Sequence, residues 1–463
     1  MSRVIAVSNR VADPEDKAAA GGLAVGVLRA LENGGGVWFG WNGKLLPAGA
    51  SGETEVRVRD GITYATIALD ETLFERYYNG FCNTTLWPLF HYRLGLSEYD
   101  RSQFESYIGV SDLFAQKLLP LLREDDLIWV HDFHLIPLGE RLRAAGATQP
   151  LGFFLHTPFP PSDVLRALPV HEQLLRGLCS YDVVGFQTER DLSAFREAVT
   201  QPGIGAVVHP DGSLRLGERT VYAMVFPIGI DVDACATRAA AGEGSRFIAD
   251  IRASLSGRRL MIGVDRLDYS KGLSRRFEAY EALLERHAEF QREIVFMQIA
   301  APTRSAVPAY TEIRHELERR AGHINGKFAE VDWVPLRYLN RAIDRGSLLA
   351  IFRLARVGLV TPFRDGMNLV AKEYVAAQDL NDPGVLVLST MAGAADELRD
   401  AVLVNPVDVD AIVEGIHRSL TMSRDERRAR QSAMLEVLRQ NDIDAWRNRF
   451  VAALSAAGGV APN

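Results

Sequence analysis

The chain has 463 residues, 47% hydrophobic and 24% charged, which is the composition of a globular protein with room for two or three domains. Its net charge of −7 excludes a globally basic nucleic-acid binder, so any anion site must be local. No apolar run reaches membrane-spanning length, the N-terminus turns polar too early for a signal peptide, and three scattered cysteines favour a reducing cytoplasm.

Short β-branched runs recur along the chain, each followed by a polar or glycine-rich loop and a helical pattern. This alternation predicts parallel sheets with right-handed crossovers. Strands are expected at residues 4–7, 128–130, 152–155, 183–186 and 221–226, and in a second series at 260–264, 294–299, 357–360 and 385–388. We interpret Pro227 to Asp233 as a hinge between the two series. The expected fold is α/β, with two Rossmann-like doubly wound domains, a cleft between them, and ligands beyond the carboxyl ends of strands.

Polar residues follow the first predicted strand. Arg10 ends the run Ser8-Asn9-Arg10, and a small-residue loop then leads to Gly21 and Gly22. These glycines would let a ligand approach the backbone closely, although a plain turn explains them equally well.

Residues 74–93 hold seven aromatic side chains. Aromatic faces with polar tips suit the C–H surface and hydroxyls of a sugar. A core segment packed under a loop is the alternative for most of these rings.

Two further strand ends carry histidines. His131, Asp132 and His134 crowd after one strand, which is a loose metal pattern with no third strong group nearby. We therefore interpret Asp132 as an acceptor for hydroxyl groups. His156 ends the next strand before a proline turn, where a structural and a functional histidine are equally plausible.

Cations gather at the start of a helix predicted near residue 275. Arg266, Lys271, Arg275 and Arg276 all lie there, where positive charge opposes the helix macrodipole. We expect a bound anion to neutralise Arg266 and Lys271, and a solvated face for Arg275 and Arg276. Arg304 has an equivalent place after the next strand.

The loop at residues 361–368 opens a helix predicted over 369–378. Asn368 is its expected N-cap, and the N–H groups of residues 369–371 would be left without partners, forming an anion site. Glu373 lies one turn further on the same face. Phosphates at the helix end and ribose hydroxyls at the carboxylate would fit a nucleotide sugar. An ordinary capped helix is the alternative.

The tail is predicted to be helical. Ser423 and Glu426 have the spacing of a capping box. A last helix after Asp444 places Trp446, Phe450 and Leu454 on one face.

Seven motifs occur in one order: VSNR, AAGGLAVG, LWPLFHYR, WVHDFHLIP, HTPFP, RLDYSKG and RDGMNLVAKEYVAAQ. With them, nearly the whole chain resembles the trehalose-6-phosphate synthase family. The resemblance implies a GT-B fold: an acceptor-binding domain at 1–229, a nucleotide-sugar-binding domain at 230–443, and a helix at 444–463 crossing back to the first domain. It implies retaining transfer of glucose from UDP-glucose to glucose 6-phosphate, without cofactor or metal, by a homo-oligomer (tetramer or dimer).

The same resemblance assigns residues by motif position. Donor binding falls to Gly21, Gly22, Arg266, Lys271, Ile343, Asp365, Met367, Asn368, Leu369, Val370 and Glu373. Acceptor binding falls to Arg10, Tyr78, Trp87, Asp132 and Arg304. The catalytic set is Asp132, His156, Arg266, Lys271 and Asp365.

Within these sets the implied roles differ. Arg266 and Lys271 would hold the pyrophosphate, Ile343 would line the uracil pocket, and Glu373 would take the ribose hydroxyls. His156 would lie beside the reacting sugar. The sequence shows no pair of carboxylates with an obvious glycosidase-like nucleophile, which fits a front-face mechanism in which the leaving phosphate accepts the acceptor's proton.

Alternatives remain at this stage. A pseudo-glycosyltransferase that joins aminocyclitols, an epimerase of UDP-N-acetylglucosamine and a non-catalytic sugar-phosphate sensor would use the same scaffold. Asp231 and Asp233 could suggest a metal-dependent GT-A enzyme, but they lie in the hinge and we interpret them as structural. UDP is the favoured nucleotide, with GDP and ADP open.

Overall fold

The computed structural model describes residues 3–12, 24, 26–28, 31, 35–50, 52–304 and 307–459. The chain divides into two compact units. Unit 1 comprises Met1–Ile228 and Ile443–Asn463, and unit 2 comprises Gly229–Asp442.

Unit 1 is built on a sheet that has ten strands among the described residues, in the order β3-β4-β2-β1-β5-β6-β7-β10-β9-β8. The run from β4 to β10 is parallel, whereas β3, β9 and β8 join antiparallel at the two edges. The strands are β1 Val4–Arg10, β2 Val37–Leu46, β3 Glu55–Arg59, β4 Ile62–Asp70, β5 Leu127–His131, β6 Leu151–Phe154, β7 Val183–Phe186, β8 Val207–Val208, β9 Leu214–Leu216 and β10 Arg219–Val225.

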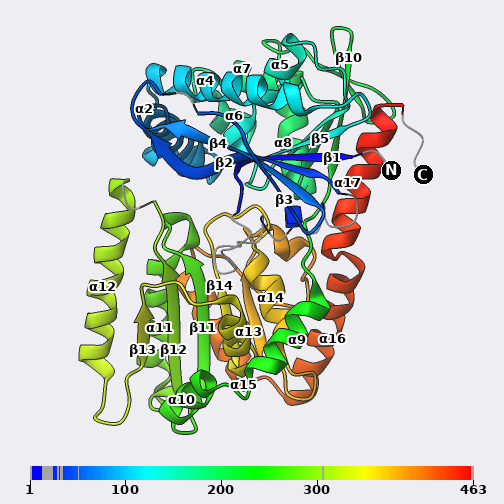
Figure 1. Cartoon of the computed structure of the whole chain (residues 1–463). Helices are drawn as coiled ribbons and strands as arrows, with labels where there is room; N and C mark the ends of the chain where they lie inside the picture. The colour runs from blue at the N-terminus through cyan, green and yellow to red at the C-terminus, as the bar shows by residue number, and fades with distance from the viewer. Residues whose placement is uncertain are drawn as a thin grey trace. The chain divides into compact units, whose positions relative to one another are not determined.

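Helices cover this sheet, with α4, α5 and α7 along one face (Figure 1). The last helix, α17, packs on β5 and β7, and its residues Trp446, Phe450 and Leu454 are buried as predicted. The helices of unit 1 are α2 Glu71–Phe74, α3 Trp87–Phe90, α4 Arg101–Leu118, α5 Leu138–Ala144, α6 Ser162–Arg166, α7 His171–Leu178, α8 Glu189–Thr200 and α17 Ile443–Ala457.

The aromatic segment forms a π-helix, η1, over Glu75–Leu86, continuous with α2 and α3. π-Helices are rare and are frequently found at functional sites. Tyr77 and Phe81 are fully buried, so part of this segment is core, as the alternative interpretation held.

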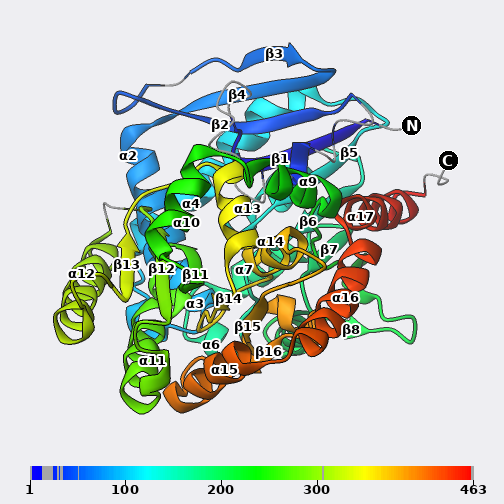
Figure 2. The same cartoon turned by 90° about the horizontal axis from the view of Figure 1, so that it is seen from below.

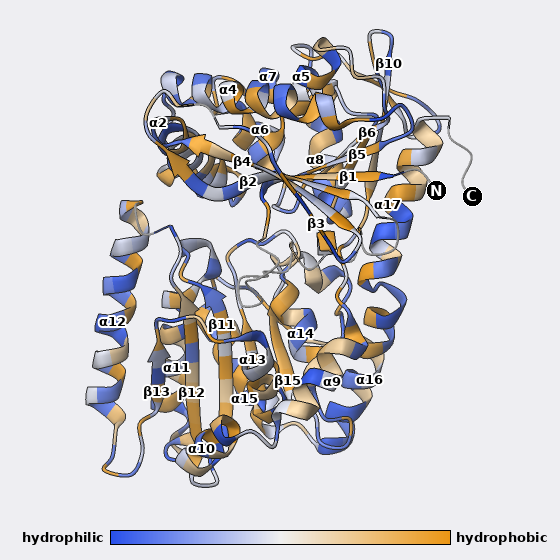
Figure 3. Cartoon of the chain, viewed as in Figure 1, coloured by the Kyte–Doolittle hydropathy of each residue, from blue (hydrophilic) through white to orange (hydrophobic). Residues whose placement is uncertain are grey.

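Unit 2 has a six-stranded sheet, entirely parallel, in the order β13-β12-β11-β14-β15-β16. Strands β12 and β15 are drawn mostly in the hydrophobic colour in Figure 3, as expected for strands covered on both faces. The strands are β11 Arg259–Arg266, β12 Ile294–Ala301, β13 Leu336–Leu339, β14 Val357–Val360, β15 Val385–Ser389 and β16 Val402–Val404.

The helices of unit 2 alternate with these strands. They are α9 Val232–Gly242, α10 Arg246–Leu255, α11 Leu273–Arg286, α12 Pro308–Phe328, α13 Arg345–Leu354, α14 Leu369–Ala377, α15 Val409–Thr421 and α16 Arg424–Gln440, with 3-10 turns η5 Tyr269–Lys271, η6 Ala288–Phe290 and η7 Gly393–Asp396. Ser423 caps α16 as predicted, and Asp231 caps α9, which gives the hinge aspartate a structural role.

The α/β fold with two parallel sheets is confirmed, and every predicted strand is present with its ends shifted by at most three residues. The strands that the sequence did not predict are β2, β3, β4, β8, β9, β13 and β16. Strands β8, β9, β13 and β16 are short, β3 is exposed, and β2 is rich in Trp and Gly. Strand β4 is largely buried and contains four β-branched residues, so its sequence was a strand signal that the prediction missed. No described helix is both long and apolar enough to cross a membrane.

Candidate functional site

Three of the predicted donor residues meet in unit 2. The Lys271 ammonium donates to Asp365 Oδ2 at 2.6 Å, and the Asn368 amide donates to the same oxygen at 2.9 Å. The backbone N–H of Gly366 donates to the other carboxylate oxygen at 3.0 Å. Asp365 is therefore fixed in position by a cation, an amide and the backbone, and Lys271 is positioned by Asp365.

The loop that carries Asp365 is tied to the segment that carries Lys271. Phe363 N–H donates to the Ser270 carbonyl at 2.8 Å. Gly272 follows with φ of +69°, and a Cβ there would collide with the Thr361 carbonyl oxygen. The close approach of these two backbones thus requires glycine.

Helix α14 begins as predicted. Asn368 is the N-cap, with φ of 75°, and its side chain accepts from Ala371 N–H at 3.1 Å. The prediction that Ala371 would offer a free N–H was wrong, because the cap uses it. The backbone N–H groups of Leu369 and Val370 remain the candidates for anion binding at this helix end. Met367, which precedes them in the sequence, is buried.

Glu373 is held by a residue that the sequence analysis missed. Arg345, the first residue of α13, donates to Glu373 Oε1 at 2.7 Å. Burial raises the pKa of Glu373, and Arg345 opposes that rise. Ile343 lies two residues before Arg345 and is half-buried, so the predicted uracil and ribose residues belong to one neighbourhood. A cation at a helix start, the pattern that singled out Lys271, could have revealed Arg345.

Arg304 and Arg266 both influence Tyr310, Arg304 through a hydrogen bond and Arg266 through its charge. Arg304 donates to the Tyr310 hydroxyl at 2.7 Å and lies 3.6 Å from Asp268, whose side chain is fully buried. Burial, and then Asp268, raise the pKa of Tyr310, whereas the charges of Arg304 and Arg266 lower it. Arg266 is exposed at the end of β11, as a site for an outside anion requires.

Arg276 corrects the cation prediction. A solvated face was expected, but its side chain is fully buried and donates to Asp265 at 2.6 Å and Gln298 at 2.8 Å. Because a buried charge requires a partner, Asp265 on β11 is the counter-ion that the sequence reasoning missed. Arg275 is half-buried and pairs with Glu278.

In unit 1, Asp132 and His156 are neighbours. Asp132 has the unusual φ of 73°. Its Oδ1 accepts a hydrogen bond from the backbone N–H of His156 at 3.2 Å. His156 is half-buried, and burial lowers its pKa to about 3, so its imidazole is neutral near pH 7.

His131 is a further residue that the sequence analysis did not assign. Its Nδ1 lies 3.2 Å from His156 Nε2, and its own Nε2 is buried without a hydrogen-bond partner among the described residues. A proton on His131 Nε2 would leave a donor unsatisfied, which costs more than an unused lone pair. We therefore assign the proton to His131 Nδ1, which donates to His156 Nε2. His156 then carries its own proton on Nδ1.

The acceptor aromatics differ in exposure. Tyr78 is half-buried and stacks on His134, with ring centroids 5.8 Å apart and an interplanar angle of 13°. Trp87 is only 5% exposed and packs on His91 and Phe133. Arg10 is exposed and lies over the Trp41 ring at 5.6 Å.

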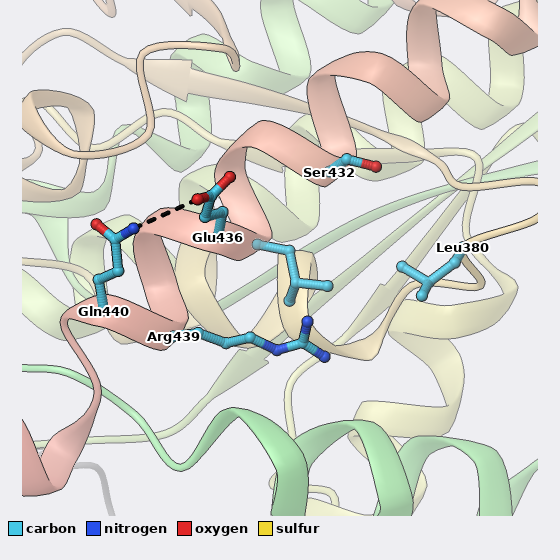
Figure 4. A pocket seen from close by; sticks show the side chains of 6 residues that line it. Leu380, Ser432, Glu436, Arg439 and Gln440 are labelled. Atoms are coloured by element: carbon cyan, nitrogen blue, oxygen red, sulfur yellow. Dashed lines mark hydrogen bonds between the residues drawn. The ribbon is translucent and has the colours of Figure 1, made fainter.

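The predicted residues Gly21 and Gly22 lie outside the described residues. Two surface hollows contain none of the predicted site residues. One, of about 260 Å³, lies beside Asp70 and Lys117 in unit 1. The other, of about 430 Å³, lies on α16 beside Leu380 (Figure 4), where Gln440 donates to Glu436 at 3.4 Å.

The chain is similar to known glycosyltransferases in sequence and in structure. The family model described as glycosyltransferase family 20 matches residues 6–456. A trehalose-6-phosphate synthase of Enterobacter sp. (strain 638) is 48% identical over 452 residues, covering 97% of this chain and 94% of the relative.

Solved structures agree. An α,α-trehalose-phosphate synthase (UDP-forming) from Burkholderia xenovorans, in complex with glucose-6-phosphate, has a TM-score of 0.95 and 50% identity, covering 98% of this chain and 100% of that one. A trehalose-6-phosphate structure from E. coli, bound with UDP-2-fluoro glucose, has a TM-score of 0.94 and 46% identity, covering 100% of both chains.

Proposed function

The chain belongs to glycosyltransferase family 20, and we propose that it transfers glucose from UDP-glucose to glucose 6-phosphate, giving α,α-trehalose 6-phosphate and UDP. The observation that carries the proposal is the assembly of Lys271, Asp365 and the start of α14. These groups come from distant parts of the sequence and combine a cation, a carboxylate and a helix N-terminus. That combination suits a sugar diphosphate.

The donor is assigned to unit 2. An ammonium has three N–H donors, and the bond to Asp365 uses one, so Lys271 can donate further to the diphosphate. Arg266 adds a second, exposed cation. As the glycosidic bond breaks, negative charge grows on the leaving phosphate, and these fixed positive groups stabilise the transition state more than the ground state.

The sugar and nucleoside contacts follow from the same geometry. Asp365 accepts hydrogen bonds from hydroxyls of the transferred glucose with a carboxylate whose two oxygens are fixed, one by Gly366 and the other by Asn368. Glu373, held by Arg345, accepts ribose hydroxyls, and Ile343 covers the uracil.

The acceptor is assigned to Arg10, Tyr78, Trp87, Asp132 and Arg304. Asp132 accepts a glucose hydroxyl, and the neutral His156 donates from Nδ1 to a sugar oxygen. Because the imidazole is neutral, it can donate this hydrogen bond without adding a further positive charge beside the reacting sugar. The acceptor hydroxyl bonds to the anomeric carbon from the face that the diphosphate leaves, and the leaving phosphate takes the hydroxyl proton. No protein nucleophile is therefore needed, and configuration is retained.

We also propose that the enzyme requires no metal and resides in the cytoplasm. We further propose that it forms a homo-oligomer, a tetramer or dimer. Cys82, Cys179 and Cys235 are buried and form no disulfide among the described residues, which supports a reducing compartment.

The test is a substrate panel. The purified protein is incubated with UDP-, GDP- or ADP-glucose, with and without glucose 6-phosphate, and products are identified by mass and NMR. We expect a non-reducing disaccharide phosphate that requires both substrates, with UDP-glucose preferred. Interconversion of a UDP-sugar without an acceptor would instead indicate an epimerase.

A further inference from the structure

Two histidines and a glutamate meet on the surface of unit 2, away from the donor residues. His287 ends α11, Glu289 follows in η6, and His417 lies on α15. One ligand atom from each lies within 4.8 Å of the other two. Among the described residues, this is the group of three or more potential metal ligands that lie so close together. Helices α11 and α15 lie side by side (Figures 1 and 2).

The geometry suits a small divalent ion. Glu289 Oε1 lies 3.2 Å from His287 Nδ1, and the rings of His287 and His417 have centroids 4.5 Å apart. Four-coordinate zinc with bonds of about 2.0–2.1 Å holds its ligand atoms roughly 3.3 Å apart. Contraction of the widest separation through side-chain rotation would therefore complete the site.

The surroundings support ligation. Phe290 packs against both imidazoles, with centroids 6.0 Å from His287 and 5.7 Å from His417, which limits their movement.

One neighbouring charge opposes a bound cation. The Arg259 guanidinium lies 5.6 Å from the Phe290 ring centroid. It donates to the Leu420 carbonyl at 3.0 Å, so part of its hydrogen-bonding capacity is used there.

We propose that His287, Glu289 and His417 bind one borderline divalent metal ion, zinc in preference, which joins the end of α11 to α15. Two imidazoles and a carboxylate are zinc ligands, with a water as the fourth. Lys271 lies two residues before the first residue of α11, and His287 directly follows its last residue. Fourteen helical residues at about 1.5 Å each separate them by roughly 20 Å. The ion is therefore structural and takes no part in glucosyl transfer.

The test titrates ZnCl2 into the metal-free full chain by calorimetry, with CoCl2 absorption as a second probe. His417→Ala should bind the ion at least tenfold more weakly than wild type. His323→Ala is the matched control, because His323 also bonds a glutamate, Glu281, at 3.1 Å but belongs to no three-ligand group among the described residues.

Thermal unfolding gives an independent readout. At a hundred times the wild-type dissociation constant, zinc should raise the Tm of wild type and His323→Ala by roughly 5 °C, and should raise the Tm of His417→Ala by about half of that or less. Glucosyl transfer should be the same in all three proteins, so this test is separate from that of the proposed function. Equal zinc affinity in wild type, His287→Ala and His417→Ala would overturn the site.

Discussion

Lys271 is the side chain with the sharpest assigned role. Lys271→Ala should raise the activation free energy by about 3–4 kcal/mol, by analogy with the loss of an oxyanion donor. This change lowers kcat roughly a hundred- to a thousand-fold. The binding of glucose 6-phosphate should change little, because the lost charge faces the leaving diphosphate. Arg275→Ala is the matched control, since Arg275 is a nearby cation that pairs with Glu278 on the helix surface. Steady-state kinetics decide, and a kcat within a few-fold of wild type would refute the assignment.

The histidine pair predicts a pH dependence of stability. Burial lowers the pKa of His131 well below its usual value and that of His156 to about 3. The unfolded chain binds protons at these imidazoles near pH 6.5, whereas the folded chain does not. Folding stability contributed by the pair is therefore present above pH 6.5 and is lost as the pH falls below it, by up to about 1.4 kcal/mol per pH unit for each histidine.

Denaturant unfolding of unit 1 between pH 7 and 5 measures this slope. His156→Asn should roughly halve it, and His315→Asn, at an exposed position of α12, should leave it unchanged. A free energy of unfolding that is flat over this range would contradict the burial of the pair in its neutral form.

At the scale of residues, the sequence predicted positions better than partners. Lys271 was identified because it follows a strand, Asn368 because it caps a helix, and Asp365 through the family resemblance. The structure brings the three together. Their mutual hydrogen bonds could not be predicted, since they depend on loop conformation. Arg276 shows the limit: helix position alone could not reveal the buried Asp265 opposite it.

At the scale of elements, Gly272 is the critical junction between η5 and α11. Gly272→Ala places a Cβ against the Thr361 carbonyl and adds left-handed strain, so it should destabilise unit 2 by about 1–3 kcal/mol and weaken UDP-glucose binding. Gly257→Ala separates the two causes, because Gly257 has φ of +83° with nothing within 4 Å of the added Cβ.

Unfolding and UDP binding are the measurements for both variants. Gly257→Ala should show only the strain, about 1 kcal/mol, with UDP binding intact. Equal losses in the two variants would mean that the contact between the Gly272 and Thr361 backbones does not shape the donor site.

Element prediction worked where periodicity and composition agreed. Strands β7 and β14 were predicted to the residue because their β-branched and apolar runs are bounded by turn residues. Strand β3 could not be predicted in this way, because every one of its residues is exposed. The π-helix η1 was also beyond reach, since its hydrogen-bond spacing leaves no distinct mark in a sequence.

At the scale of the whole molecule, the proposed mechanism takes its catalytic charge from side chains and a helix end, so catalysis should not require a metal. Initial rates in excess EDTA should equal those with added manganese or magnesium. Activity that disappears in EDTA and returns with either ion would contradict this. The zinc site inferred at His287 would be empty in EDTA, so loss of Tm without loss of rate is the combined expectation.

The family and fold of the molecule could be inferred from motif order, and the comparisons confirm both. The order of strands within each sheet could not, because chain order does not determine spatial order and the edge strands beyond β1, among them β2 and β4, were not predicted. Gly21 and Gly22 stay predictions, since they lie outside the described residues.

The central claim is that glucose 6-phosphate is the acceptor. The direct measurement is kcat/KM for glucose 6-phosphate against glucose, with UDP-glucose as donor, in wild type and Arg304→Ala. Tyr310→Phe is the matched control, because it removes the hydroxyl bonded to Arg304 and keeps the guanidinium.

The wild type should use free glucose very poorly, since the phosphate is the partner expected for Arg10 and Arg304. A hydrogen bond to a charged group contributes about 1.5–3 kcal/mol, so Arg304→Ala should lower kcat/KM for glucose 6-phosphate roughly ten- to a hundred-fold while UDP binding persists. Nearly equal use of glucose and glucose 6-phosphate by the wild type, or an unchanged ratio in Arg304→Ala, would contradict the account.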